Sequence, residues 1–287
     1  MNWFECNGKE LIPMTTTATM TTQTEQLKRR LVATWNAGDY DTFSRPMAAG
    51  AEIFHQRLNI EAGDTLLDVG CGSGQLALIA ARAGARVTGC DIASNWIEKA
   101  RLRAAEEGLK VQFDVADAEC LPYADGQFDV VASLIGAMFA PRPELVAFEL
   151  TRVCRPGGLI AMGNWTPSGF VGQMFKLIAR YIAPAGMPSP VLWGDEANVR
   201  QRLSSGITSL SLTPRMYVFE YPFSPDEVVE FFRVNYGPMK NAFLSLDAAA
   251  QRELRRDLVA LWSAHNQSGG RSTEVYAEYL EVLATRN

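Results

Sequence analysis

The sequence of 287 residues predicts an α/β fold with a doubly wound, mostly parallel sheet. Three observations carry this prediction. Short apolar runs alternate with helical patterns over residues 60–165, which is typical of βαβ units. Several of these runs end in an acidic residue. The first run leads directly into a glycine-rich loop and then into a helical pattern.

The glycine-rich loop, Gly70-Cys71-Gly72-Ser73-Gly74, follows the apolar run that contains Asp68. Such a loop brings backbone N–H groups and a helix N-terminus close to a bound small molecule. Glycines suit this place because they accept a positive φ and lack a Cβ atom that would hold a ligand away. Since position 75 is Gln, the loop departs from the dinucleotide pattern G-x-G-x-x-G. A glycine-rich turn can also be purely structural, so the prediction of a ligand site needs further evidence from the later strands.

Four further β-rich runs cover residues 85–91, 111–118, 128–133 and 159–162. The second run of the chain ends in Asp91, about 20 residues after the glycine loop, where an acid can bind a ribose. The third ends near Asp117. Acidic residues at successive strand ends predict a ligand across the carboxyl edge of the sheet.

Five motifs in this region resemble, in family order, those of the class I S-adenosylmethionine-dependent methyltransferases. They occupy residues 67–74, 89–92, 117–123, 128–131 and 152–158. The likeness is to the small-molecule branch similar to ubiquinone/menaquinone-biosynthesis methyltransferases. It implies S-adenosylmethionine as cofactor, methyl transfer to a small acceptor, and a Rossmann-like sheet of seven strands with an antiparallel last strand.

The resemblance implies that one group of residues binds the methionine part of the cofactor. Gly70, Gly72 and Gly74 would lie against it through their backbone. Asp68 would order this loop or reach the methionine amine through water. Ser133, at the end of the fourth run, would offer backbone groups to the same amine.

A second group would bind the adenosine part. Asp91 would accept hydrogen bonds from both ribose hydroxyls, and Ile92 would pack on the adenine. Asp117 would accept from the adenine amine, while the Ala118 N–H faces a ring nitrogen.

The composition limits the possible partners. A formal net charge of −5 argues against nucleic acid, whose binding normally needs a basic face. The densest basic cluster, Lys28-Arg29-Arg30, is typical of a solvated helix face. With two histidines the chain is not expected to build a His-based metal site, and no apolar run reaches the ~18–20 residues of a membrane span. We therefore expect a small-molecule partner, with no metal and no membrane span.

The five cysteines have an odd count and no C-x-x-C spacing. Three of them lie in or beside the predicted strands and loops, which predicts buried free thiols in a reducing compartment. The expected location is therefore cytoplasmic. The sequence leaves the oligomeric state open.

The chain divides into three predicted parts. Residues 1–24 are Thr-rich and are expected to form a mobile tail, 25–60 to form helices that cover the cofactor, and 61–287 to form the methyltransferase domain. Cap insertions are expected near 166–194 and 224–267. The last apolar run, near 273–284, also suits a helix by propensity, and its prediction as a strand rests on the resemblance.

We expect the acceptor pocket to lie between the N-terminal helices and the two insertions, because long insertions in compact domains usually act as lids or binding loops. An oligomer interface is the alternative for the insertions. Trp35, Tyr40 and Phe43 are candidates for the pocket wall, although such aromatic residues also form ordinary cores. Phe231 and Phe243 are the candidates from the second insertion.

Methyl transfer from a sulfonium is an in-line displacement on an activated carbon, so the enzyme mainly aligns the reactants and excludes water. A general base is needed only where the acceptor must first lose a proton, and the catalytic residues stay unknown at this point. The residues considered for that role are His55, His265, Tyr40, Tyr236 and Glu220. Residues 134–137 lack the Pro-Pro dipeptide of methyltransferases that act on nucleobase amines.

Two other functions stay open. A non-catalytic cofactor-binding or partner module could use the same fold. A nicotinamide-dependent oxidoreductase would share the loop and Asp91 but not the glycine spacing or the pair Asp117-Ala118.

Overall fold

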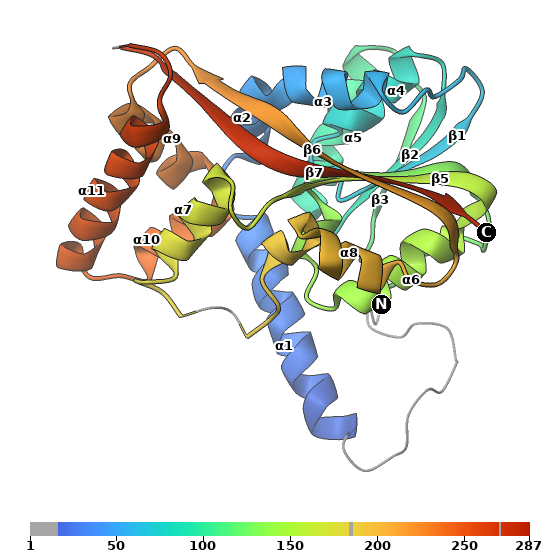
Figure 1. The fold of residues 1–287 in the computed structure, drawn as a ribbon, viewed down its shortest axis with the longest axis horizontal. Helices are drawn as coiled ribbons and strands as arrows, with labels where there is room; N and C mark the ends of the chain where they lie inside the picture. The colour runs from blue at the N-terminus through green and yellow to red at the C-terminus, as the bar shows by residue number, and fades with distance from the viewer. Residues whose placement is uncertain (1–16, 184–185, 270) are drawn as a thin grey trace.

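The computed structural model describes residues 17–183, 186–269 and 271–287. Its central feature is a seven-stranded sheet with the order β3-β2-β1-β4-β5-β7-β6 (Figure 1). The strands are β1 (Thr65–Val69), β2 (Arg86–Asp91), β3 (Val111–Val115), β4 (Phe128–Leu134), β5 (Cys154–Trp165), β6 (Ile207–Tyr221) and β7 (Thr273–Arg286). The first five are parallel, and β7 is antiparallel to both β5 and β6. The predicted fold class, including the antiparallel last strand, is confirmed.

The N-terminal part is helical, as predicted, but its first helix begins earlier. The elements are α1 (Thr17–Trp35), α2 (Tyr40–Ser44), η1 (Arg45–Met47) and α3 (Ala48–Gln56). The predicted tail ended at residue 24, whereas α1 already begins at Thr17. Threonine is a poor helix former, but adding a turn to an existing helix is far easier than nucleating one. Residues 1–16 of the predicted tail lie outside the described residues.

The helices of the βαβ region are α4 (Gln75–Arg82), α5 (Ser94–Glu106), η2 (Ala137–Phe139) and α6 (Pro143–Val153). Between β5 and β6 lie α7 (Phe170–Ile178), η3 (Pro190–Gly194) and α8 (Glu196–Arg202). Between β6 and β7 lie α9 (Pro225–Asn235), α10 (Gly237–Leu244) and α11 (Ala248–His265). The second insertion is therefore helical, as expected.

The last strand illustrates how burial overrides propensity. From Thr273 to Tyr279 the residues alternate between buried and more exposed positions, the period of a strand with one covered face. Of the three glutamates that suit a helix by propensity, Glu274 and Glu278 occupy half-buried positions of this alternation, and Glu281 is buried. Side-chain packing on the sheet thus decides the structure of this segment.

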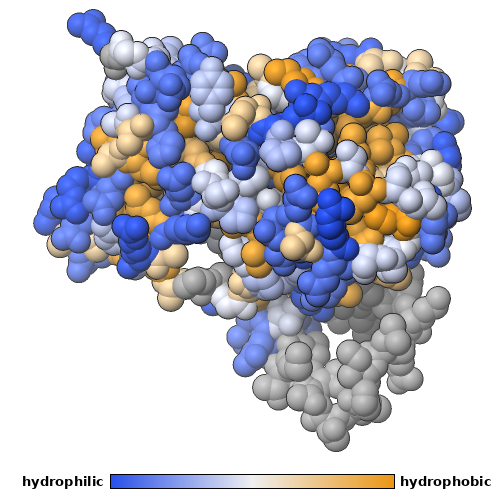
Figure 2. All heavy atoms as spheres, viewed as in Figure 1, coloured by the Kyte–Doolittle hydropathy of each residue, from blue (hydrophilic) through white to orange (hydrophobic). Residues whose placement is uncertain are grey.

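The cap, which we define as α7 and α9–α11, packs at the β6–β7 end of the sheet (Figure 1). Helix α9 begins at a capping box in which the Ser224 and Glu227 side chains each accept from the other residue's backbone N–H. Aromatic side chains of the sheet and the cap form the core between them, with Trp262 fully buried. The outer surface of α11 is mostly hydrophilic (Figure 2).

Three cysteines, Cys71, Cys90 and Cys154, are buried free thiols, as predicted. Cys120 is instead disulfide-bonded, so the prediction of free thiols is wrong at this position. None of the helices built from the described residues combines the length and apolar character needed to cross a membrane.

Candidate functional site

A cavity lies at the carboxyl edge of the sheet, next to the ends of β1 and β4. The strand order reverses between these two strands, which is where doubly wound sheets bind their ligands. The cavity is lined mainly by apolar and aromatic side chains with a few charged groups among them, a combination typical of small-molecule sites. Its walls come from the loops after β1 to β4 and from α1, α2, α5 and η2.

The glycine loop after β1 forms the floor of the cavity through Gly70 and Gly72. Gly72 has a φ of 53°, and a Cβ atom there would lie 3.0 Å from the Tyr40 ring, so a larger residue would be strained and crowded. Gly74 does not line the cavity. It is the N-cap of α4, and a Cβ atom would meet the Phe113 ring at 3.0 Å, so close helix–strand packing explains this glycine.

Asp91, at the end of β2, lines the cavity and fixes two backbone segments. Its Oδ2 accepts the Gly72 N–H at 2.9 Å and its Oδ1 accepts the Ala93 N–H at 2.9 Å. Burial raises the pKa of Asp91, and hydrogen bonds from backbone N–H groups oppose that rise. Since a carboxylate has about four acceptor positions, these bonds leave room for further donors.

Asp68 lies behind the glycine loop, in a second and smaller cavity that shares Tyr40, Gly70 and Gly72 with the first. Its Oδ2 accepts the Ala77 N–H at 3.1 Å, which ties β1 to α4. Burial, together with the nearby charge of Asp91, raises the pKa of Asp68 to about 7. The carboxyl group therefore joins the strand before the glycine loop to the helix after it.

Ile92, after β2, and Asp117 and Ala118, after β3, also line the cavity. Asp117 is already engaged, because the ammonium group of Lys28 forms an ion pair with its Oδ2. Lys28 also pairs with Glu119 Oε2 at 2.5 Å. All four residues predicted for the adenosine part thus line one cavity.

Lys28 is the residue that the sequence prediction missed. It belongs to the basic cluster expected on a solvated face, yet only 4 % of it is exposed and it lines the cavity. The spacing of Lys28, Leu31 and Trp35 at i, i+3 and i+7 places them on one face of α1, and all three line the cavity. That spacing was the available signal, since Arg29 and Arg30 on the other faces are exposed.

The loop after β4 departs from the prediction by two residues. Ser133 is buried and does not line the cavity; its Oγ donates to the Val69 carbonyl at 2.7 Å and accepts the Ala137 N–H at 2.8 Å. Ser133 therefore joins β4 to β1. Ile135, Gly136 and Ala137 line the cavity instead. Ile135 has a φ of 57°, a strained value for a β-branched residue and one that is often found at functional sites.

Aromatic side chains form one wall of the cavity. Trp35 and Tyr40 line it as predicted, together with Phe139 of η2. The rings of Trp35 and Phe139 meet edge-on at 4.9 Å between centroids. Phe43 lies outside the cavity and stacks on Tyr236 at 4.7 Å in the core.

The predicted contributions of Phe231 and Phe243 to a pocket are not found. Phe243 is 3 % exposed, and Phe231 packs against Tyr221 and Phe223. Neither side chain lines the cavity, because the cap buries its aromatic residues against the sheet.

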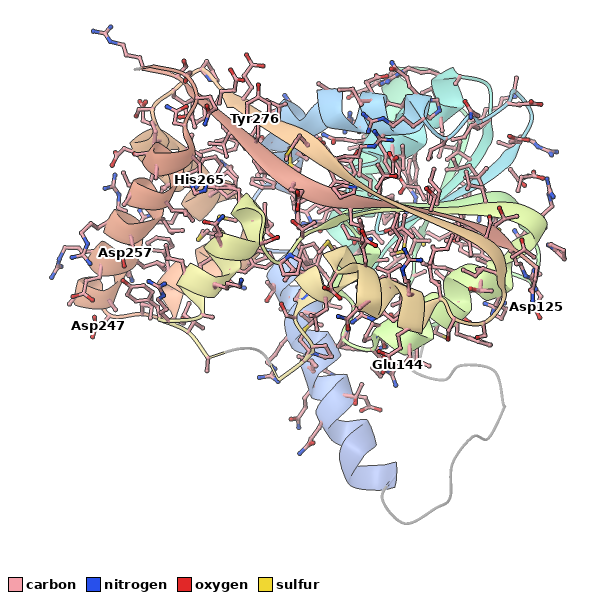
Figure 3. All side chains as sticks on the ribbon, viewed as in Figure 1. Asp125, Glu144, Asp247, Asp257, His265 and Tyr276 are labelled. Atoms are coloured by element: carbon pink, nitrogen blue, oxygen red, sulfur yellow. The ribbon has the colours of Figure 1, made fainter. Side chains whose placement is uncertain are left out.

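The candidates for a general base are poorly placed. Tyr40 reaches the cavity, but burial and the charge of Asp91 raise its pKa well above the usual range. Glu220 is exposed on β6, and His55 lies on α3 outside the cavity. His265 sits at the end of α11, where its ring packs on Phe170 at the start of α7 (Figure 3). Tyr236 is buried in the core and burial raises its pKa.

Comparison with known proteins agrees with this geometry. The family described as "Methyltransferase domain" matches residues 67–162. The chain is 38% identical over 242 residues to the uncharacterized protein Rv1405c of Mycobacterium tuberculosis, which covers 83% of this chain and 88% of that protein. It is 42% identical over 116 residues to methyltransferase GfsG of Streptomyces halstedii, covering 39% and 42% respectively. Its fold is similar to that of geranyl diphosphate methyltransferase solved in complex with SAM, with a TM-score of 0.51, 21% identity, and coverage of 84% and 85%.

Proposed function

The chain belongs to the class I S-adenosylmethionine-dependent methyltransferases, and we propose that it methylates a small, partly hydrophobic acceptor that arrives already nucleophilic. The cofactor is S-adenosylmethionine, which supplies a methyl group on a positively charged sulfur.

The residues of the cavity fit this cofactor. We assign the ribose to Asp91, the adenine to Ile92, Asp117 and the Ala118 N–H, and the methionine part to the loop at Gly70 and Gly72. The free acceptor positions of Asp91 support the first assignment. The positive φ of Gly72 and its place among the residues that line the cavity support the last. Asp68, in the adjoining cavity, suits the positively charged methionine amine.

We infer the class of acceptor from the lack of a suitable general base among the described residues that line the cavity. Lys28 and Asp117 are ion-paired, Asp91 holds the loop, and the pKa of Tyr40 is raised. None of these groups is suited to remove a proton from a weak acid. Catalysis then rests on alignment and on exclusion of water, which suffice for a thiolate, a neutral amine or a phenolate.

The aromatic wall of Trp35 and Phe139 supports a partly hydrophobic acceptor. Flat rings bury large apolar areas and favour a ligand with a ring or a branched chain.

The test is a panel of acceptors offered to the purified protein with S-adenosylmethionine, with formation of S-adenosylhomocysteine as the readout. Aromatic thiols, amines and phenols that are acidic enough to be ionised at neutral pH should be methylated, and unactivated alcohols should not. Turnover of alcohols alone would contradict the proposal, because these acceptors need a base. Tight cofactor binding without turnover on any acceptor would favour a non-catalytic module.

A further inference from the structure

We infer that Lys28 is a positioning residue for the cofactor, which fixes the carboxylate of Asp117 and holds α1 across the adenine end of the cavity. The inference rests on the proposed assignment of Asp117 to the adenine amine. In this view α1 does more than cover the cavity, because its Lys28 forms an ion pair with a residue of the cofactor site.

The charges around Lys28 form a closed set. Glu119 has a fully buried side chain and accepts from Lys28, from the Arg142 guanidinium at 2.8 Å and from the Arg142 N–H at 2.6 Å. With Asp117 the cluster holds two acids and two bases, so its net charge is zero. Buried charges are tolerated when they are paired in this way, and removing one member leaves an uncompensated charge.

Lys28 lies far from the point where the C-terminal end of α1 is attached, so its ion pairs hold a separate part of the helix. The C-terminal end of α1 is fastened by a hydrogen bond of 2.6 Å from the Trp96 Nε1–H to the Trp35 carbonyl. Lys28 lies about 10 Å further up the helix. The salt bridges of the described α1 residues are those of Lys28, and the amino end of α1 projects from the body (Figure 1). Loss of the salt bridges of Lys28 would therefore release the amino-terminal part of α1 from the end of the cavity that we assign to the adenine.

Asp117 is held at both oxygens. Its Oδ1 accepts the Glu119 N–H at 2.9 Å, and its Oδ2 accepts from the Lys28 ammonium. These bonds fix the plane of a carboxylate that is 19 % exposed and that lines the cavity. The remaining acceptor positions then point in defined directions, which suits recognition of an amino group and disfavours a carbonyl oxygen at the same place.

The consequence is a specificity that depends on Lys28. Binding of S-adenosylhomocysteine is compared with binding of S-inosylhomocysteine, in which a carbonyl replaces the adenine amine. Calorimetry is run on the wild type, on Lys28→Met, which removes the charge and keeps an unbranched side chain only one atom shorter, and on Arg29→Ala, which removes an exposed charge one residue away. The wild type and Arg29→Ala should prefer the adenosyl compound at least about tenfold, the range of one hydrogen bond to a charged group.

Lys28→Met should lose about tenfold in affinity for S-adenosylhomocysteine and most of its preference over the inosyl compound. Lys28→Arg, which restores a cation, should recover the preference; Lys28→Gln is measured if the Met variant fails to fold. Equal weakening of both compounds would show a merely structural role and overturn the inference, as would an unchanged preference. A wild type that binds neither compound would refute the cofactor site itself, an outcome distinct from failure of the Lys28 variants alone.

Discussion

The region around the ends of β1 to β4, which we call the cofactor half, and the cap differ in what their side chains contact. Around the ends of β1 to β4, polar groups such as Asp91 and Asp117 point at backbone N–H groups and into the cavity. In the cap, aromatic rings pack on one another. Trp262, for example, contacts Phe170 at 4.6 Å and Phe232 at 5.1 Å between centroids.

The contrast bears on our proposal for the acceptor site. The inner aromatic residues of the cap are buried in the core and stabilise the fold, so in our proposal only the edge of the cap lies near the acceptor. At that edge Trp35 packs on Tyr236 at 6.0 Å, and Phe139 lies 6.3 Å from Phe175 of α7. The cap supports the aromatic wall from behind.

The largest expected effect is on stability and lies in the cap. Trp262→Ala should lower the free energy of unfolding by about 3–5 kcal/mol, because it removes a fully buried ring from a packed core. Chemical denaturation measures the loss, and calorimetry of the same variant should give wild-type affinity for S-adenosylhomocysteine. A clear loss of cofactor affinity in the folded variant would show that the two halves are not separate in function.

The second effect is on cofactor binding. Asp91→Ala removes hydrogen bonds to a charged group worth about 1.5–3 kcal/mol each, so the affinity should fall about 10-fold to 150-fold or more. The loss of the Gly72 N–H bond adds to it. Asp129→Ala is the control, since Asp129 is a strand acid that bonds Thr65 and Arg155 outside the cavity. Unchanged affinity in the Asp91 variant would make the ribose assignment wrong.

A smaller effect concerns the aromatic wall. Phe139→Ala should raise the KM for the acceptor about tenfold, the range expected for removing part of a ring contact, while cofactor affinity changes little. Phe148→Ala is the matched control, because that ring is 61 % exposed on α6. If both Phe variants behave like the wild type toward the acceptor, the wall lies elsewhere.

The smallest effect is a pH dependence from Asp68, whose pKa is raised to about 7 by burial. Below this pH the carboxyl is neutral, and above it the negative charge attracts the methionine amine. Affinity for S-adenosylhomocysteine should therefore rise by up to about tenfold between pH 6 and pH 8. Asp68→Asn should abolish the rise, and a variant that keeps the same pH profile would place the methionine amine away from this carboxyl.

Much of the cofactor half could be predicted from the sequence, because its signals are local. Strand ends, the glycine loop and the acids Asp91 and Asp117 follow from short patterns whose geometry a parallel sheet imposes. The sequence did not predict which residues after β4 line the cavity. Whether Ser133 or Ile135 faces it depends on the path of the backbone in this loop. A positive φ at Ile135 is not indicated by its residue type.

Contacts between segments that are far apart in the chain could not be predicted from local sequence patterns. Lys28 and Asp117 are 89 residues apart, and a lysine beside two arginines looks solvated until its partners are in place. The aromatic residues of the cap illustrate the same limit. Helical spacing places Phe231 and Phe243 on inward faces, but whether the neighbour is a core or a pocket depends on the sheet opposite.

The most direct test of the central claim is a crystal structure of the protein with S-adenosylhomocysteine. The ribose hydroxyls should lie within hydrogen-bonding distance of the Asp91 carboxylate, with the adenine beside Ile92 and its amine at Asp117. The sulfur should face the wall formed by Trp35 and Phe139. Density for the compound at another edge of the sheet, or with its ribose away from Asp91, would contradict the account.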